Sequence, residues 1–117
     1  MRTDFFVYSI DQTTLAPSTS AVKTITIADT DFIVDKIVAN PLNADVRVNI
    51  RITSTGYDVF DKATAIINIA GNGTLPFELN KQNLKFNARD TIQITLQNLS
   101  TSATYNVDLS FIGRKII

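Results

Sequence analysis

The sequence predicts an all-β protein: a single-domain antiparallel β-sandwich, jelly-roll-like, with about eight strands. Apolar and polar residues alternate strictly over 46–52, 92–96 and 105–111. Because side chains of a strand point to opposite faces in turn, this period indicates strands with one apolar and one polar face. Turn-forming residues recur at roughly 8 to 12 residue spacing. No segment shows a convincing amphipathic-helix pattern.

In the N-terminal half, turn residues separate the expected strands. A strand or an ordered arm is expected over 5–10, followed by a polar loop over 12–21 that contains Pro17. Further strands are expected over 23–28, 32–40 and 46–53. Residues 29–31, 42–45 and 54–56 are expected to turn, and Pro41 ends the strand before it.

The C-terminal half begins with one long strand or two short ones over 57–60 and 63–70, where β-branched residues argue against a helix. The Gly71-Asn72-Gly73 segment indicates a turn or bulge. Short strands are expected over 77–79 and 84–86. The last two strands, over 91–98 and 105–112, are expected to form a hairpin.

The composition restricts the classes of function. The 117 residues are enough for one domain with its own core, which we divide into an N-terminal strand or arm with its loop (1–22) and a β-sandwich (23–117). Eleven basic residues balance eleven acidic ones, so no direct binding of nucleic acid is expected. The chain has no cysteine and no histidine. We therefore expect no enzyme, no catalytic residues and no cofactor. No membrane span and no signal peptide are expected.

Three carboxylates form a weak candidate for a metal site: Asp29, Asp31 and Asp35. Carboxylate oxygens suit hard cations such as calcium. The spacing lacks the glycine and the distal glutamate of an EF-hand loop. A solvated turn whose carboxylates accept local hydrogen bonds is the favoured interpretation, and we expect no metal.

Alternation breaks down over 5–10, where both faces are apolar. One face carries Phe5 and Val7, and the other carries Phe6, Tyr8 and Ile10. Such a segment is either buried on both sides or covered by another chain, and we expect a partner surface. The same argument applies to the apolar C-terminus. The predicted interface residues are Phe5, Phe6, Tyr8, Ile116 and Ile117.

A pattern of strand and turn residues extends from 71 to the end. It reads Gly71-x-Gly73-x-x-Pro76-Phe77-x-Leu79, Phe86, Thr91-Ile92-x-Ile94-x-Leu96-x-Asn98-Leu99-Ser100 and Tyr105-Asn106-Val107-x-Leu109-x-Phe111-x-Gly113-x-Lys115-Ile116. This pattern resembles small structural proteins of bacteriophage particles, and the resemblance extends over about 32–117. No catalytic motif comes with it.

The resemblance implies a non-enzymatic virion component: a minor capsid, decoration, vertex or connector protein assembled in the host cytoplasm. Its implied partners are further copies of itself and other virion proteins, such as a major capsid, portal or vertex protein. Deletion of residues 1–11 is then expected to abolish assembly and leave the domain folded. The alternative is a carbohydrate-binding or adhesin-like β-sandwich that uses Tyr57 or Tyr105 as a sugar platform. A small hydrolase that uses carboxylates is disfavoured.

Overall fold

The computed structural model describes residues 2–40, 43–59, 62–68 and 84–117. Over these residues the chain forms ten strands and one short 3₁₀-helix. The strands are β1 (Thr3–Ser9), β2 (Thr13–Leu15), β3 (Ser20–Thr26), β4 (Phe32–Asn40), β5 (Val46–Ile52), β6 (Tyr57–Asp58), β7 (Thr64–Ala65), β8 (Lys85–Phe86), β9 (Thr91–Asn98) and β10 (Tyr105–Ile116); the helix η1 is Ile66–Asn68.

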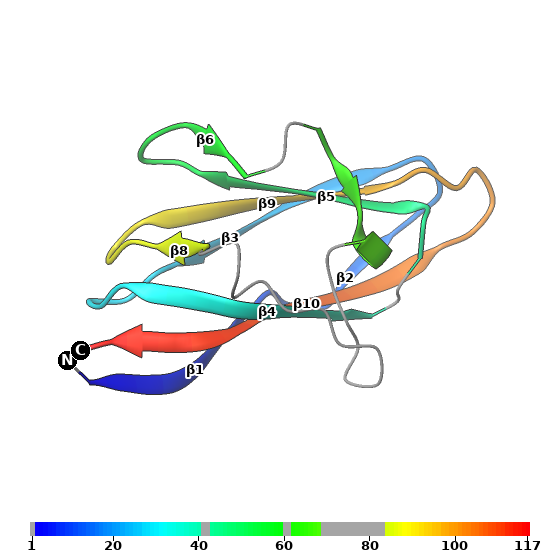
Figure 1. Cartoon of the computed structure of the whole chain (residues 1–117). Helices are drawn as coiled ribbons and strands as arrows, with labels where there is room; N and C mark the ends of the chain where they lie inside the picture. The colour runs from blue at the N-terminus through cyan, green and yellow to red at the C-terminus, as the bar shows by residue number, and fades with distance from the viewer. Residues whose placement is uncertain (1, 41–42, 60–61, 69–83) are drawn as a thin grey trace.

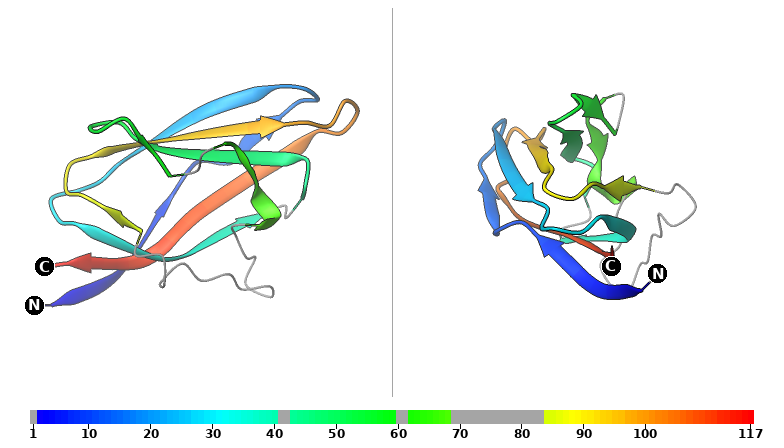
Figure 2. Two further views of the ribbon diagram at one scale, coloured as in Figure 1. Left: turned by 45° about the horizontal axis from the view of Figure 1, so that its top comes forward. Right: turned by 90° about the vertical axis from the view of Figure 1, so that its left-hand side faces the viewer.

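The strands form two antiparallel five-stranded sheets that face each other as a sandwich (Figures 1 and 2). The first sheet has the order β1-β10-β4-β8, with β2 also paired to β10. The second has the order β3-β9-β5-β6, with β7 also paired to β5. The pairs are nested: β1 and β2 pair with β10, β3 with β9, β4 with β8, and β5 with β6 and β7. The all-β, sandwich-like prediction is therefore confirmed.

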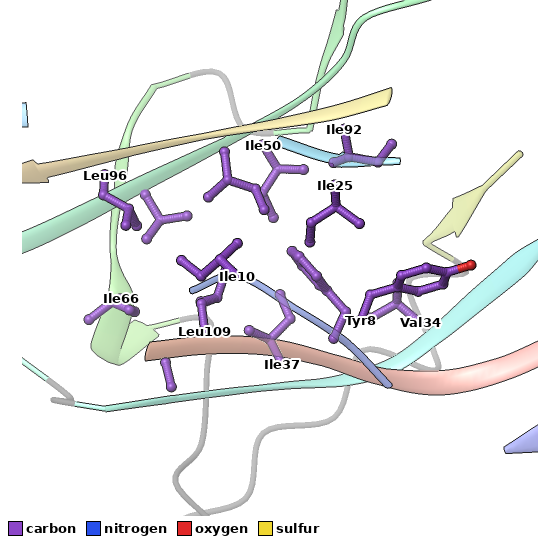
Figure 3. Close-up of a cluster of buried hydrophobic side chains, with 14 of the residues drawn as sticks. Tyr8, Ile10, Ile25, Val34, Ile37, Ile50, Ile66, Ile92, Leu96 and Leu109 are labelled. Carbon is purple, nitrogen blue, oxygen red and sulfur yellow. The ribbon is translucent and has the colours of Figure 1, made fainter. Parts of the chain in front are cut away.

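The core lies between the two sheets and is built by the predicted alternation. Every second residue of β5 is buried, and the same holds along β9 up to Leu96 and along β10 from Val107 to Gly113. These rows meet the inward side chains of β4 in one apolar cluster (Figure 3). Burial of such side chains is the main favourable term in folding.

The predicted strands at 32–40, 46–53, 91–98 and 105–112 match β4, β5, β9 and β10, and the last runs on to Ile116. The interpretation of 12–21 as a loop was wrong in part, because Leu15 and Thr13 are buried and β2 pairs with β10. Residues 66–68 form a 3₁₀-helix, so the strand predicted over 63–70 was wrong there, and of its described residues only Thr64–Ala65 are strand. The segments predicted at 71–73 and 77–79 lie outside the described residues.

The first 22 residues do not form a separate arm. β1 and β2 both pair with β10, and the proposed boundary at 22 and 23 falls inside β3. Tyr8, Ile10 and Leu15 belong to the same apolar cluster as the rest of the core. The expectation that residues 1–11 can be removed without unfolding the domain therefore conflicts with the packing, because their removal would take away Tyr8 and Ile10.

A buried asparagine ties together the corner where β2, β3, β9 and β10 meet. The side-chain amide of Asn98 donates to the carbonyls of Leu15, Ala16 and Ala103 at 3.2, 3.2 and 2.9 Å. Its Oδ1 accepts from the N–H of Ser100 at 2.9 Å. The amide of Asn98 thus finds partners for both its donor and its acceptor groups inside the protein.

Candidate functional site

β1 is the outermost strand of the first sheet. It pairs with β10 in continuous register from Thr3 opposite Ile116 to Ser9 opposite Ser110, and no strand pairs with its other edge among the described residues. In Figure 1 it lies at the margin of the molecule, beside the C-terminal end of β10. An open strand edge presents unpaired N–H and C=O groups to any other strand.

The hydrogen bonds at the two ends of β1 establish which residues face the open edge. Arg2 and Ile117 exchange both backbone hydrogen bonds, at 3.2 and 2.7 Å, and Ile10 donates to Leu109 at 3.1 Å. Bonded and non-bonded pairs alternate in an antiparallel ladder, so the even-numbered residues of β1 bond to β10. The backbone groups of the odd-numbered residues therefore point to the open edge: Thr3, Phe5, Val7 and Ser9.

The sequence predicts two apolar faces for β1, and the structure places them in different environments. Phe5 and Val7 point away from the core, and 74% of Phe5 is exposed. Beside them on β10, Ile112 lies opposite Val7 and Ile116 lies opposite Thr3, and both are half-buried. We call Phe5, Val7, Ile112 and Ile116 the outer strip.

The inner face of β1 packs against this chain's own core. The ring of Phe6 meets that of Tyr8 edge-on with centroids 4.8 Å apart, and Tyr8 meets Phe32 in the same way at 4.8 Å. The ammonium group of Lys115 lies 3.8 Å from the centre of the Phe6 ring, a cation–π contact. The Tyr8 hydroxyl accepts from the N–H of Ala28 at 3.1 Å.

The predicted interface residues therefore occupy different environments. Phe5 and Ile117 are strongly exposed, Phe6 and Ile116 are at the surface, and Tyr8 is only 8% exposed. Tyr8 thus serves the core and offers no surface to a partner. Val7 and Ile112 join the surface instead. The signal for Ile112 was in the sequence, because Phe111 and Ile112 are adjacent apolar residues where alternation calls for a polar one.

Gly113 fixes how β1, β10 and β4 come together. The register between β10 and β4 shifts between Ile112 and Gly113, as at a β-bulge. A Cβ at Gly113 would collide with the carbonyl oxygen of Ile33, and it would approach the Phe32 ring at 3.0 Å. The close approach that requires glycine is therefore between the backbones of β10 and β4, and Gly113 lies opposite Phe6 on the other side.

The three candidate metal-binding carboxylates do not converge. Asp31 accepts from the N–H of Ala88 at 2.8 Å and lies 3.2 Å from the ammonium of Lys85. These contacts, the Ala88 hydrogen bond first, lower the pKa of Asp31 below its ordinary 3.8.

Asp35 forms a two-pronged ion pair with Arg114, at 3.1 and 3.0 Å, while Asp29 is exposed. Across the described parts of the chain, no group of three acidic side chains is placed to hold a metal ion. Two of these three carboxylates therefore accept from groups far away in the chain, whereas the solvated-turn interpretation expects local hydrogen bonds.

The tyrosines of the carbohydrate-binding alternative also differ. The Tyr105 hydroxyl accepts from Asn43 at 3.1 Å and donates to Asp45 at 3.4 Å, and its ring packs against the core. Tyr57 is 58% exposed. Only Tyr57 of the pair thus offers a ring face to a sugar.

No protein-family model matches the sequence, and no curated protein matches it. In the parts of the chain that the structure describes, no helix has the length and apolar character needed to cross a membrane. Fold and surface together define the class: over the described residues, a sandwich-like all-β protein in which the open edge strand β1 lies beside an apolar outer strip.

Proposed function

We propose that this protein is a non-enzymatic structural component of a bacteriophage virion, a minor capsid, decoration, vertex or connector protein that acts by packing against other proteins. The observation that carries the proposal is the β1 edge: a seven-residue strand whose outer edge pairs with no strand among the described residues, with the exposed Phe5 and Val7 beside it. Exposed apolar surface of this kind marks protein interfaces. The resemblance of residues 32–117 to phage structural proteins supports the same assignment.

The strand order supports the finer assignment of the fold. We infer a jelly roll, because nested pairs arise when one long antiparallel hairpin wraps into two sheets. β1 and β2 with β10 form the open end of that hairpin, and β5 with β6 and β7 lie at its closed end. Double-sheet jelly rolls are found in viral capsid and lectin domains.

Co-purification with particles tests the proposed role. An antibody raised against the purified protein is used on phage particles banded in a density gradient from producing cells. We expect the protein in the particle band and gold label on the particles. The proposal fails if the protein stays at the top of the gradient while complete particles band normally.

The exposed Tyr57 supports one alternative function, that of a carbohydrate-binding module. Aromatic faces at a protein surface stack on sugar rings, and lectin domains share the inferred fold. A glycan array with wild type and Tyr57→Ala tests this alternative. Binding by the wild type that the substitution abolishes supports it, and an array without any signal rejects it.

A further inference from the structure

The open strand edges of the sandwich are protected to different degrees. β6, β7 and β8 have two residues each, too short to template another strand. β3 has seven residues, but the charged Lys23 lies at its middle in the row that faces the interior with Ala21 and Ile25. An inward-pointing charge is a known protection against edge pairing.

β1 carries its one charged residue near its N-terminal end and not at its middle. It also has seven residues, and its last five, from Phe5 to Ser9, carry neither charge nor proline. The charged residue, Asp4, pairs at 3.4 Å with Arg2, which precedes the strand. β1 is therefore better suited than β3, β6, β7 or β8 to accept a further strand.

We propose that the partner of this edge is β1 of a second copy of the chain, paired antiparallel about a two-fold axis that passes beside Phe6. Residue numbers of facing positions then sum to twelve, which brings all seven residues of β1 into the ladder. Phe5 faces Val7 of the second copy, and Thr3 faces its Ser9. A two-fold axis makes both halves of the contact identical.

Backbone geometry favours this register independently of its length. The residues that face the open edge are Thr3, Phe5, Val7 and Ser9, and this register pairs each of them with another member of the same set. Such pairs exchange both hydrogen bonds, so the ladder gains roughly eight. A shift by one residue would set outward-facing groups against inward-facing ones and lose these bonds.

Side chains and charges are compatible with the same register. On the outer face, Phe5 and Val7 of each copy meet in one apolar cluster that extends the outer strip. Asp4 faces Tyr8 of the second copy and Arg2 faces its Ile10, so no charged residue faces its own equivalent. The result is one continuous sheet through both copies, in the order β4-β10-β1 and then β1-β10-β4 of the second copy.

This inference rests on the interface part of the proposed function and names the partner. Proline substitutions on the edge strands β1 and β3 test the pairing with a second copy, and sedimentation equilibrium measures the oligomeric state. The N–H of Val7 points to the open edge, so Val7→Pro removes a donor of the new ladder and none of the β1–β10 ladder. Val22→Pro is the matched control, an exposed valine on β3. The backbone bonds from Ile27 to Asp90 and from Asn98 to Thr19 show that the odd-numbered residues of β3 bond to β9. The N–H of Val22 therefore also faces away from the neighbouring strand.

We expect wild type and Val22→Pro to sediment as dimers, and Val7→Pro as a folded monomer with at least a tenfold weaker association. A wild type that stays monomeric at about 100 µM, well above the Kd of most specific complexes, overturns the proposal. So does a Val7→Pro variant that is folded and still dimeric.

Single cysteines test the register, because the chain has none of its own. Phe6 of the two copies would face each other at a non-bonded pair, about 4.5 Å apart at Cα, within disulfide range. Ser9→Cys would lie about 20 Å from its equivalent. We expect oxidised Phe6→Cys to run as a linked dimer and Ser9→Cys as a monomer; equal linking of both rejects the register.

The outcomes of the two proposals are separable. A monomeric wild type that still bands with particles leaves the virion role standing and removes the second copy as partner. A dimeric wild type that never bands with particles supports the second copy as partner and removes the virion role.

Discussion

Tyr8 links the N-terminal strand to the core, and its replacement tests whether β1 is integral to the fold. The side chain is almost fully buried and contacts the rings of Phe6 and Phe32. Truncation of a buried aromatic side chain to alanine costs about 3–5 kcal/mol. The hydrogen bond from Ala28 to the Tyr8 hydroxyl adds about 0.5–1.5 kcal/mol. We therefore expect Tyr8→Ala to lose about 4 kcal/mol of unfolding free energy and Tyr8→Phe about 1 kcal/mol.

Urea unfolding measures these losses at dilution, where copies of the chain are separated. With a slope of about 2 kcal/mol per molar urea, Tyr8→Ala should lower the midpoint by roughly 2 M. Phe5→Ala is the matched control, because its ring projects from the opposite face of the same strand. We expect that control to stay within about 0.5 kcal/mol of wild type. A Tyr8→Ala variant as stable as Phe5→Ala would refute the argument and restore the interpretation of 1–11 as a dispensable arm.

Three further predictions concern residues that hold the two sheets in place. Gly113→Ala should lose about 3 kcal/mol of unfolding free energy or fail to fold, because the new Cβ meets the β4 backbone. Thermal unfolding, with Ser110→Ala as the control, measures this loss. Asn98→Asp should lose about 3 kcal/mol of unfolding free energy, because a buried carboxylate cannot donate to the three carbonyls. The loss should shrink as the pH falls and the carboxylate takes up a proton. A urea unfolding midpoint equal to that of wild type would contradict this prediction. The folded pKa of Asp31 is lowered by the Ala88 N–H and by Lys85, so its stabilisation is complete above pH 3.8 and is lost as the pH falls through the lowered pKa. Wild type should therefore lose more stability than Asp31→Asn between pH 5 and pH 2, and parallel urea curves would argue against this contact.

Much of the fold could be predicted from alternation, because the period of two reports directly which face of a strand is buried. It located β4, β5, β9 and β10 and the split of β1 into a Phe5 face and a Phe6 face. It could not locate β2, whose three residues are too short to show a period. Leu15 alone carried the signal there, inside a polar stretch that also contains Pro17.

The candidate site was harder to predict, because it depends on which strands become neighbours. An apolar residue at 6 or 8 has the same sequence signature whether its own core or a partner covers it. The pairing of β1 with β10 decides between them, and it places Tyr8 inside and leaves Phe5 outside. The ion pair of Asp35 with Arg114 likewise joins residues far apart in the chain, which carboxylate spacing cannot reveal.

Amide hydrogen exchange, followed residue by residue by NMR at two protein concentrations, tests the role of the β1 edge most directly. The N–H groups of Phe6 and Tyr8 bond to β10 and should be protected at both concentrations. Those of Phe5 and Val7 should exchange rapidly in dilute protein and become protected in concentrated protein, when a second copy pairs with the edge. Rapid exchange of Phe5 and Val7 at both concentrations would contradict the account.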